Sequence, residues 1–402
     1  MRQDIPPGQK QAYTAAFSAL FSRFTAPLMD YTLLTSITCT AYTGFAAVMA
    51  AGRYRARALD RAPAAGTGHV SVLVPYRNEA HRLDALIRSV KRVSAETGWE
   101  FIFIDDHSDD HSGEILYAAF ADAAQVRLLR LPPGRSGKKA ALAYGVNHAV
   151  HADIIATDAD CTLHIPALTA MRDRLQIPGI RMVCGPVVQY SGEGFGAGLA
   201  DLEFLSLVAS GISFWGLGMP FMANGAFLGF KKSAFVEVGG FAGNEAFPGG
   251  DDVFLLQKMT ARYGNGAIRF MTGKEGAVHT AGDTGLREFI SRRTRWGAKA
   301  SAYRRPAPAL ATLFVFAVCS LYAFTFLATA LTGRGSLLLY AAAGKLGADV
   351  LLLAPVCARL RRRDLWPYIL PASLLHPFYI LFTGLWAAGG KYAWKKRNYG
   401  RR

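Results

Sequence analysis

The chain has 402 residues, of which 51% are hydrophobic and only 18% are charged, and its formal net charge is +16. About a quarter of the residues in a soluble domain are normally charged, so this composition argues against a wholly soluble protein. The positive charge leaves two partners open, a nucleic acid or the anionic surface of a membrane. Five cysteines, an odd number with irregular spacing, fit neither a zinc motif nor a disulfide framework.

The first predicted element is a transmembrane helix at about 31–52. This stretch carries no charge and is long enough to cross a hydrocarbon core of about 30 Å. It starts too far from the N-terminus, and is too long, for the apolar core of a cleavable signal peptide. Four arginines follow it, which favours a cytoplasmic C-terminal end; they are Arg53, Arg55, Arg57 and Arg61. We assign residues 1–65 to this N-terminal segment.

Residues 66–305 are predicted to form one α/β domain. Short apolar runs at 70–74, 101–104, 126–131 and 153–157 are typical of buried strands. Stretches with helical spacing of apolar residues, such as 83–90 and 140–150, separate them. Strands that alternate with helices indicate a mostly parallel sheet.

Residues 306–402 form a predicted C-terminal membrane domain. Its apolar segments lie at about 306–333, 335–358 and 365–390. Lys345 and Asp349 lie four residues apart in the second of these, so they share one helix face and can pair.

The last apolar segment leaves two topologies open. It contains Pro367, Pro371 and Pro377, and a basic tail follows it. A full crossing would place that tail outside the cell, whereas a re-entrant or interfacial segment keeps it inside, which we favour. Basic residues flank the membrane segments throughout, so the net charge is explained by membrane topology and no nucleic-acid partner is expected.

Acidic residues recur where the predicted strands end, which is where parallel α/β sheets bind ligands. Asp158 and Asp160, separated by one residue, follow the strand at 153–157. Two carboxylates on such a turn can hold a hard divalent cation, Mg²⁺ or Mn²⁺, that bridges nucleotide phosphates. Turns are rich in aspartate, so an isolated pair would be weak evidence, but Asp105 and Asp106 follow an earlier strand in the same way.

Three further sites could bind anions or carry a base. Gly134 to Lys139 form a basic, glycine-containing turn before a helix, which is either an anion site or an exposed turn. Asp251 and Asp252 open a helix, either as a cap or with one of them as a general base. The segment Arg292-Arg293-Thr294-Arg295-Trp296 is either a positive-inside flank or a clamp for a diphosphate.

Taken in order, these motifs resemble the family 2 glycosyltransferases. The matching segments are Val74-Pro75-Tyr76-Arg77-Asn78-Glu79, Asp105-Asp106-His107-Ser108, Gly137-Lys138-Lys139-Ala140-Ala141-Leu142, Asp158-Ala159-Asp160, Asp251-Asp252 and Arg292 to Trp296. The resemblance covers about 66–300. It implies a GT-A-type fold, a mostly parallel sheet with helices on both faces, flanked by transmembrane helices.

The resemblance also implies roles for individual residues. Asp252, with Asp251 beside it, would be the catalytic base, and Asp158 and Asp160 would bind the metal. Residues expected to bind the donor, a nucleotide sugar and by resemblance a UDP-sugar, are Pro75, Glu79, Asp106, Lys138, Asp158, Arg292, Arg295 and Trp296. Two positions depart from the family pattern: Arg292 stands where glutamine is usual, and Asp251 where glutamate is usual.

We therefore expect a multi-pass enzyme of the inner membrane with a cytoplasmic catalytic domain. It would transfer a sugar, with inversion, to a lipid or lipid-linked acceptor. Residues 202–221 are mostly apolar and are either core or an interfacial helix that admits such an acceptor. The alternatives are a processive polysaccharide synthase and a non-catalytic membrane scaffold with a degenerate transferase domain.

Overall fold

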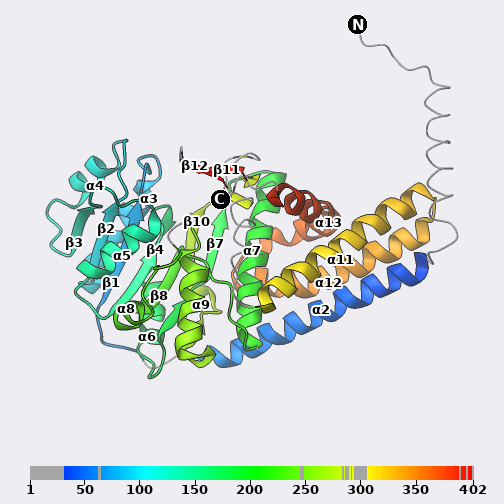
Figure 1. Cartoon of the computed structure of the whole chain (residues 1–402), viewed down its shortest axis with the longest axis horizontal. Coiled ribbons are helices and arrows are strands. Elements are labelled where there is room, and N and C mark those ends of the chain that lie inside the picture. The colour runs from blue at the N-terminus through cyan, green and yellow to red at the C-terminus, as the bar shows by residue number, and fades with distance from the viewer. Residues whose placement is uncertain are drawn as a thin grey trace, which may run out of the picture.

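The computed structural model describes residues 31–61, 65–244, 249–282, 285, 289–290, 292–293, 306–388, 391–394 and 397–400. An α/β domain forms one end of the molecule, and long helices from both ends of the chain extend away from it side by side (Figure 1).

The main sheet of the described chain has seven strands in the order β3-β2-β1-β4-β8-β6-β9. The first four are mutually parallel, whereas β8 runs antiparallel to both β4 and β6. The predicted mostly parallel α/β fold is thereby confirmed. The strands are β1 (Val70–Tyr76), β2 (Glu100–Asp105), β3 (Val126–Arg130), β4 (Asp153–Thr157), β6 (Met182–Cys184), β8 (Phe227–Lys231) and β9 (Ile268–Phe270).

Strand side chains alternate between two apolar layers, because successive residues of a strand point to opposite faces. Phe101 and Phe103 of β2 pack on one face of the sheet, and Ile102 and Ile104 on the other. All residues of β1, β2 and β4 are buried, as expected for a sheet covered on both sides. The first face is covered by α3 (Leu83–Thr97), α4 (Ser112–Phe120) and α6 (Ile165–Leu175), and the second by α5 (Lys138–His148), α8 (Lys232–Glu237) and α9 (Asp251–Tyr263).

A small second sheet lies between the main sheet and the membrane helices (Figure 1). It has the order β5-β10-β7, with β10 antiparallel to β5 and parallel to β7. The strands are β5 (Cys161–Thr162), β7 (Val187–Tyr190) and β10 (Val278–Ala281), and two single-turn helices lie nearby in sequence, η1 (Asn265–Ala267) and η2 (Lys274–Gly276).

Five helical segments in the described chain are long and apolar enough to cross a membrane. Four overlap the predicted membrane segments, and the fifth is α7 (Phe195–Gly216), which overlaps the apolar stretch 202–221. The four are α2 (Tyr31–Leu59), α11 (Pro306–Leu331), α12 (Gly335–Arg359) and, after the single turn η4 (Arg363–Leu365), α13 (Trp366–Ala388).

Helix α7 belongs to both parts of the molecule. The indole N–H of Trp215 donates to the Ile268 carbonyl at 3.1 Å, so one face of α7 packs on the α/β domain. Its other contacts include α2, which it crosses where Gly52 meets Gly216. A Cβ on either glycine would overlap the backbone of the other helix, so this crossing requires glycine.

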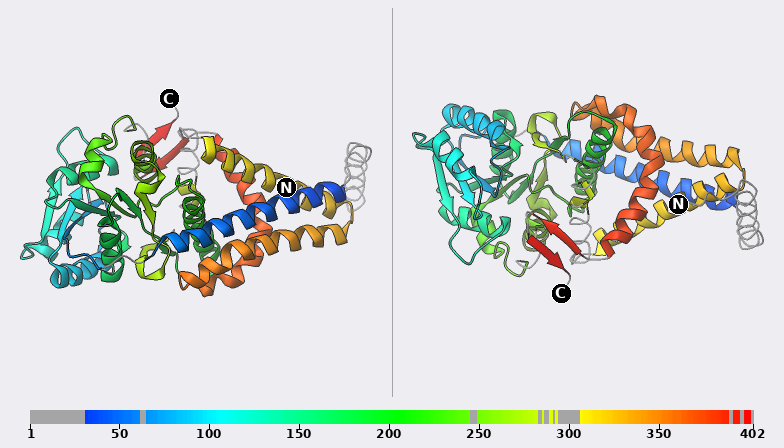
Figure 2. Two further views of the ribbon diagram at one scale, coloured as in Figure 1. Left: turned by 90° about the horizontal axis from the view of Figure 1, so that it is seen from below. Right: turned by 90° about the horizontal axis from the view of Figure 1, so that it is seen from above.

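Helix α13 does not run the length of the bundle. It crosses the other long helices obliquely, and β11 (Lys391–Trp394) and β12 (Arg397–Gly400) lie beside the α/β domain (Figure 2). Tyr368 near its start packs on Phe195 of α7, and Gly384 near its end lies against Phe316 of α11. The two ends of α13 therefore pack on different helices, α7 at the start and α11 near the end.

A buried ion pair joins the membrane helices. Lys345 is fully buried and contacts Asp349 at 2.5 Å, and the hydroxyl of Tyr42 on α2 donates to Asp349 at 2.6 Å. The i, i+4 pair expected from the sequence therefore also holds α12 to α2.

Asp60 fixes α2 to the α/β domain. Its carboxylate pairs with Arg174 of α6 at 2.5 Å and accepts the N–H of Thr272 at 2.7 Å. Arg359, the last residue of α12, donates to the Thr272 carbonyl at 2.8 Å. Two membrane helices thus end on the same loop of the α/β domain.

Candidate active site

The loops that follow β1 and β2 are joined by hydrogen bonds. Asn78 has a positive φ of 53°, which asparagine tolerates, and its side chain exchanges two hydrogen bonds with Asp109, at 2.6 and 2.9 Å. The N–H of Glu79 donates to the Ser112 hydroxyl at 2.8 Å. Glu79 is therefore held by its backbone at the carboxyl end of the sheet, with its side chain on the wall of the cavity described below.

Asp106 connects the β2 loop to the basic turn before α5. Its carboxylate accepts the N–H of Gly137 at 2.9 Å, and its carbonyl accepts a hydrogen bond from Arg77 at 2.6 Å. The turn 134–137 uses two glycines with positive φ, and α5 then begins at Lys138. The helix starts earlier than expected from the sequence, so Lys138 lies on its first turn.

Lys138 links two carboxylates that are far apart in sequence. Its ammonium lies 2.7 Å from Asp158 Oδ1 and 2.7 Å from Asp251 Oδ2, and it donates to the Gly225 carbonyl at 3.1 Å. Burial disfavours the charged amine, but the two carboxylates outweigh it and raise the pKa of Lys138 above its usual value. The ammonium is therefore protonated throughout the physiological range.

Asp158 lies in a cluster of negative charge. Burial raises its pKa, Lys138 lowers it, and Asp160 and Asp251 raise it further, with a net rise above the ordinary value. Asp160 lies 4.0 Å from Arg82. A cation near these carboxylates would relieve their repulsion.

A divalent cation would have to complete its shell with non-protein ligands. No group of three His, Cys, Asp or Glu side chains within the described part of the chain is arranged to hold a metal ion. Mg²⁺ and related ions commonly bind through one or two carboxylates plus substrate phosphates and water. Asp158 and Asp160 fit that pattern.

Asp251 and Asp252 begin α9 after Gly250, which has a φ of 77°. Asp251 is buried and faces Lys138, whereas Asp252 is less buried and accepts the N–H of Gly225 at 3.2 Å. The backbone of Gly225 thus contacts both Lys138 and Asp252. A Cβ at this position would lie 3.0 Å from Lys138 Nζ and closer still to Asp251.

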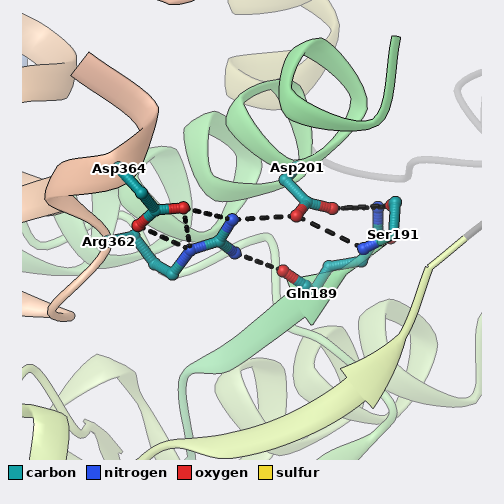
Figure 3. A network of polar contacts seen from close by, with 5 residues as sticks. All are labelled: Gln189, Ser191, Asp201, Arg362 and Asp364. Atoms are coloured by element: carbon teal, nitrogen blue, oxygen red, sulfur yellow. Dashed lines mark hydrogen bonds and ion pairs between the residues drawn. The ribbon is translucent and has the colours of Figure 1, made fainter. Parts of the chain in front are cut away.

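Arg292 is positioned by a buried polar network at the membrane side of the domain. Its guanidinium donates to the side-chain oxygen of Gln189 at 3.1 Å. The amide nitrogen of Gln189 donates to Ser191 at 2.9 Å and to Asp201 at 3.2 Å (Figure 3). Asp201 in turn pairs with Arg362, from the turn between α12 and α13, at 2.8 Å.

Arg293 and Glu203 form an ion pair next to this network. The guanidinium of Arg293 also lies 4.6 Å above the ring of Phe289, and Tyr379 of α13 donates to Glu203 at 3.2 Å. No motif in the sequence predicted a role for Gln189, Asp201 or Glu203. One signal was available, because two acids in the apolar stretch of α7 require partners.

One cavity of about 1520 Å³ lies at the carboxyl end of the sheet. Each described residue of the predicted site lines it: Pro75, Glu79, Asp106, Lys138, Asp158, Asp160, Asp251, Asp252 and Arg292. Arg295 and Trp296 lie outside the described residues. The cavity continues between the membrane helices, where Phe316, Leu352 and Ile380 line it together with Asp349 and His376.

The fold is of the GT-A type found in nucleotide-sugar glycosyltransferases. It is similar to the mannosyltransferase PcManGT from Pyrobaculum calidifontis, whose structure is a complex with GDP-Man and Mn²⁺. The TM-score is 0.51 at 18% sequence identity, with 89% of this chain and 99% of that chain covered.

Residues 71–239 match the family model described as "Glycosyl transferase family 2", so this part of the chain is a family 2 glycosyltransferase domain. Undecaprenyl-phosphate 4-deoxy-4-formamido-L-arabinose transferases of Salmonella paratyphi B and Salmonella newport are each 35% identical over 109 residues. That match covers 26% of this chain and 33% of those proteins, a third of their length.

Proposed function

We propose that the chain transfers a sugar from a nucleotide-diphosphate sugar, a UDP-sugar by resemblance, to a hydroxyl of a lipid or lipid-linked acceptor. The reaction would take place at the cytoplasmic face of the inner membrane, with inversion. One observation carries this proposal: the carboxylates at the sheet edge and the apolar membrane helices line the same cavity. A polar donor and an apolar acceptor can therefore meet there without leaving the protein.

The donor would occupy the end of the cavity at the β1, β2 and β4 loops. Pro75, Glu79 and Asp106 would contact the base and ribose, and Lys138 and Arg292 the diphosphate. Asp158 and Asp160 would hold Mg²⁺ or Mn²⁺, which supplies positive charge against the diphosphate when bound. Arg295 and Trp296 are proposed to close over the same group.

Asp252 is proposed as the base. Backbone N–H groups of Gly225 and Val253 hold its carboxylate, at 3.2 and 2.7 Å, and fix its direction. As the acceptor oxygen attacks the anomeric carbon, its proton passes to Asp252 and the bond to the diphosphate oxygen breaks. Attack from the face opposite the leaving group inverts that carbon.

The acceptor would enter from the membrane end. Its apolar part can lie among Phe316, Leu352 and Ile380, with its hydroxyl directed toward Asp252. The Salmonella relatives are named for transfer to undecaprenyl phosphate, which supports a lipid-linked acceptor.

A second candidate, a processive polysaccharide synthase, is favoured by one feature. The membrane end of the cavity also carries Tyr42, Asp349 and His376, polar groups that a growing glycan could contact. Product length separates the candidates, since single transfer adds one sugar per acceptor and processive synthesis gives long products.

The test uses the full chain in detergent, a panel of nucleotide sugars, Mg²⁺ or Mn²⁺, and lipid extract. Nucleoside diphosphate release and the mass of the lipid product are followed for the wild type and Asp252→Asn. We expect release that requires both lipid and Asp252. Absence of release with every donor, in folded protein, would favour the scaffold alternative.

A further inference from the structure

The ammonium of Lys138 is surrounded by three oxygens from three different elements. Asp158 follows β4, Asp251 begins α9, and Gly225 lies just before β8. The contacts are 2.7, 2.7 and 3.1 Å. The geometry resembles that of a small cation held in an oxygen cage, with the lysine supplying the positive charge.

The same carboxylate is required for two purposes. Asp158 Oδ1 contacts Lys138, yet Asp158 is also the residue proposed to bind the divalent cation. Two cations that close together repel each other strongly where solvent is restricted. A metal ion can therefore bind Asp158 well only if Lys138 moves toward another anion.

The nucleotide itself provides that anion. A diphosphate at the sheet edge would attract the ammonium of Lys138, which reaches the cage from the first turn of α5. The cage is tightly packed around the ammonium, because even a methyl group on Gly225 would collide with Asp251 and crowd Lys138.

We propose that Lys138 is a resident cation that occupies the metal-binding carboxylate until the nucleotide arrives, so that the divalent cation binds with the diphosphate and only weakly alone. This inference rests on the proposed function, since it assumes that Asp158 is a metal ligand. It assigns Lys138 two successive partners, the carboxylates first and the diphosphate afterwards.

The experiment measures Mn²⁺ binding to the full chain in detergent by electron paramagnetic resonance of the free ion, with and without UDP, GDP, CDP or dTDP. Wild type is expected to bind Mn²⁺ weakly alone and more tightly with one of the diphosphates. Lys138→Met should bind Mn²⁺ alone about tenfold more tightly than wild type, because the competing charge is gone. If the methionine variant does not fold, Lys138→Gln takes its place, because glutamine can still donate hydrogen bonds to the cage. This variant should also bind Mn²⁺ alone more tightly than the wild type.

Lys231→Met is the matched control. Lys231 pairs with Asp153 at 2.6 Å, at the opposite end of β4, so this variant loses a similar ion pair outside the cavity. Its Mn²⁺ affinity should equal that of the wild type. Asp158→Asn combined with Lys138→Gln should lose the gain in Mn²⁺ affinity that Lys138→Gln shows by itself.

Two results would overturn the inference in different ways. If folded Lys138→Met and Lys138→Gln bind Mn²⁺ alone no better than the wild type, Lys138 does not compete for the site, although the proposed function stands. If the wild type binds no Mn²⁺ with any diphosphate, the metal site fails, and the proposed function with it.

Discussion

The side-chain oxygen of Gln189 accepts a hydrogen bond from Arg292, while its amide nitrogen faces the carboxylate of Asp201. Turning the amide over would place its oxygen against Asp201, so only one orientation is compatible with both neighbours. Gln189 therefore holds Arg292 at the cavity wall.

The first prediction is that Gln189→Leu lowers kcat/KM for the donor about tenfold, because Arg292 loses its fixed direction. Arg292→Ala should have a similar effect, and the double variant should be no worse than Arg292→Ala alone. Steady-state kinetics of the two single variants and the double variant completes this double-mutant cycle. Asp364→Asn, which touches Arg362 from the exposed side, is the control and should behave as the wild type. Additive losses would refute the coupling.

Asp252→Asn should lower kcat by roughly 10²- to 10⁴-fold, because the amide cannot take the acceptor proton. Donor affinity should be unchanged, because no donor contact is assigned to this side chain. Calorimetric titration with the nucleotide sugar and a transfer assay separate the two effects. Near-normal transfer by the variant would remove Asp252 from the mechanism.

Gly225→Ala should abolish transfer while leaving a folded protein. The added methyl would collide with Asp251 and crowd Lys138, so both would shift from their present contacts. Gly196→Ala is a suitable control, since nothing lies within 4 Å of a Cβ there and alanine favours the helix. Transfer assays on both variants provide the comparison, and full activity of Gly225→Ala would contradict the crowded geometry.

Replacing both residues of the pair Lys345–Asp349 should lower the stability of the protein less than replacing either one alone. Lys345→Met or Asp349→Leu alone leaves a buried charge without its partner and should cost about 3–5 kcal/mol. The double variant should be closer to the wild type than either single variant. Thermal unfolding in detergent measures this order. A double variant less stable than both singles would mean that the pair stabilises the bundle in itself.

Glu100 should contribute stability that depends on pH. Burial would raise the pKa of its carboxyl, but hydrogen bonds from Ser71, Val150 and Arg127 lower it below the ordinary value of 4.5. A lowered pKa in the folded state gives stability that is present above pH 4.5 and is lost as the pH falls through the folded value. Glu100→Gln should therefore melt below the wild type at pH 7, and the difference should shrink in acid. A difference that does not vary with pH would argue against this linkage.

The sequence was most informative where structure is local. The strands at 70–74, 101–104 and 153–157 were recognised because buried parallel strands are short, continuous apolar runs. The first two runs lie within β1 and β2 of the structure, and the third coincides with β4. The long apolar segments each overlap a long helix, because a continuous apolar run of about 20 residues exceeds the length of a strand, although α2 continues through its basic flank to Leu59.

The sequence was least informative where contacts are remote. Asp201 and Arg362 are 161 residues apart, and no spacing rule joins them. Nor does apolar composition separate a core helix from a membrane helix, because both bury apolar surface. Helix α7 packs both on the α/β domain and on α2. The oblique path of α13 depends on packing against α7 and α11, which its prolines permit but do not specify.

The position of Arg362 also has a consequence for biosynthesis. A ribosome completes the catalytic domain long before this arginine emerges, and until then Asp201 and Gln189 lack the guanidinium that lies against them in the finished protein. This network can therefore close only after the segment that joins α12 to α13 has been synthesised. Gln189, which accepts a hydrogen bond from Arg292, would therefore reach its full set of contacts only after the helices α12 and α13 have been made.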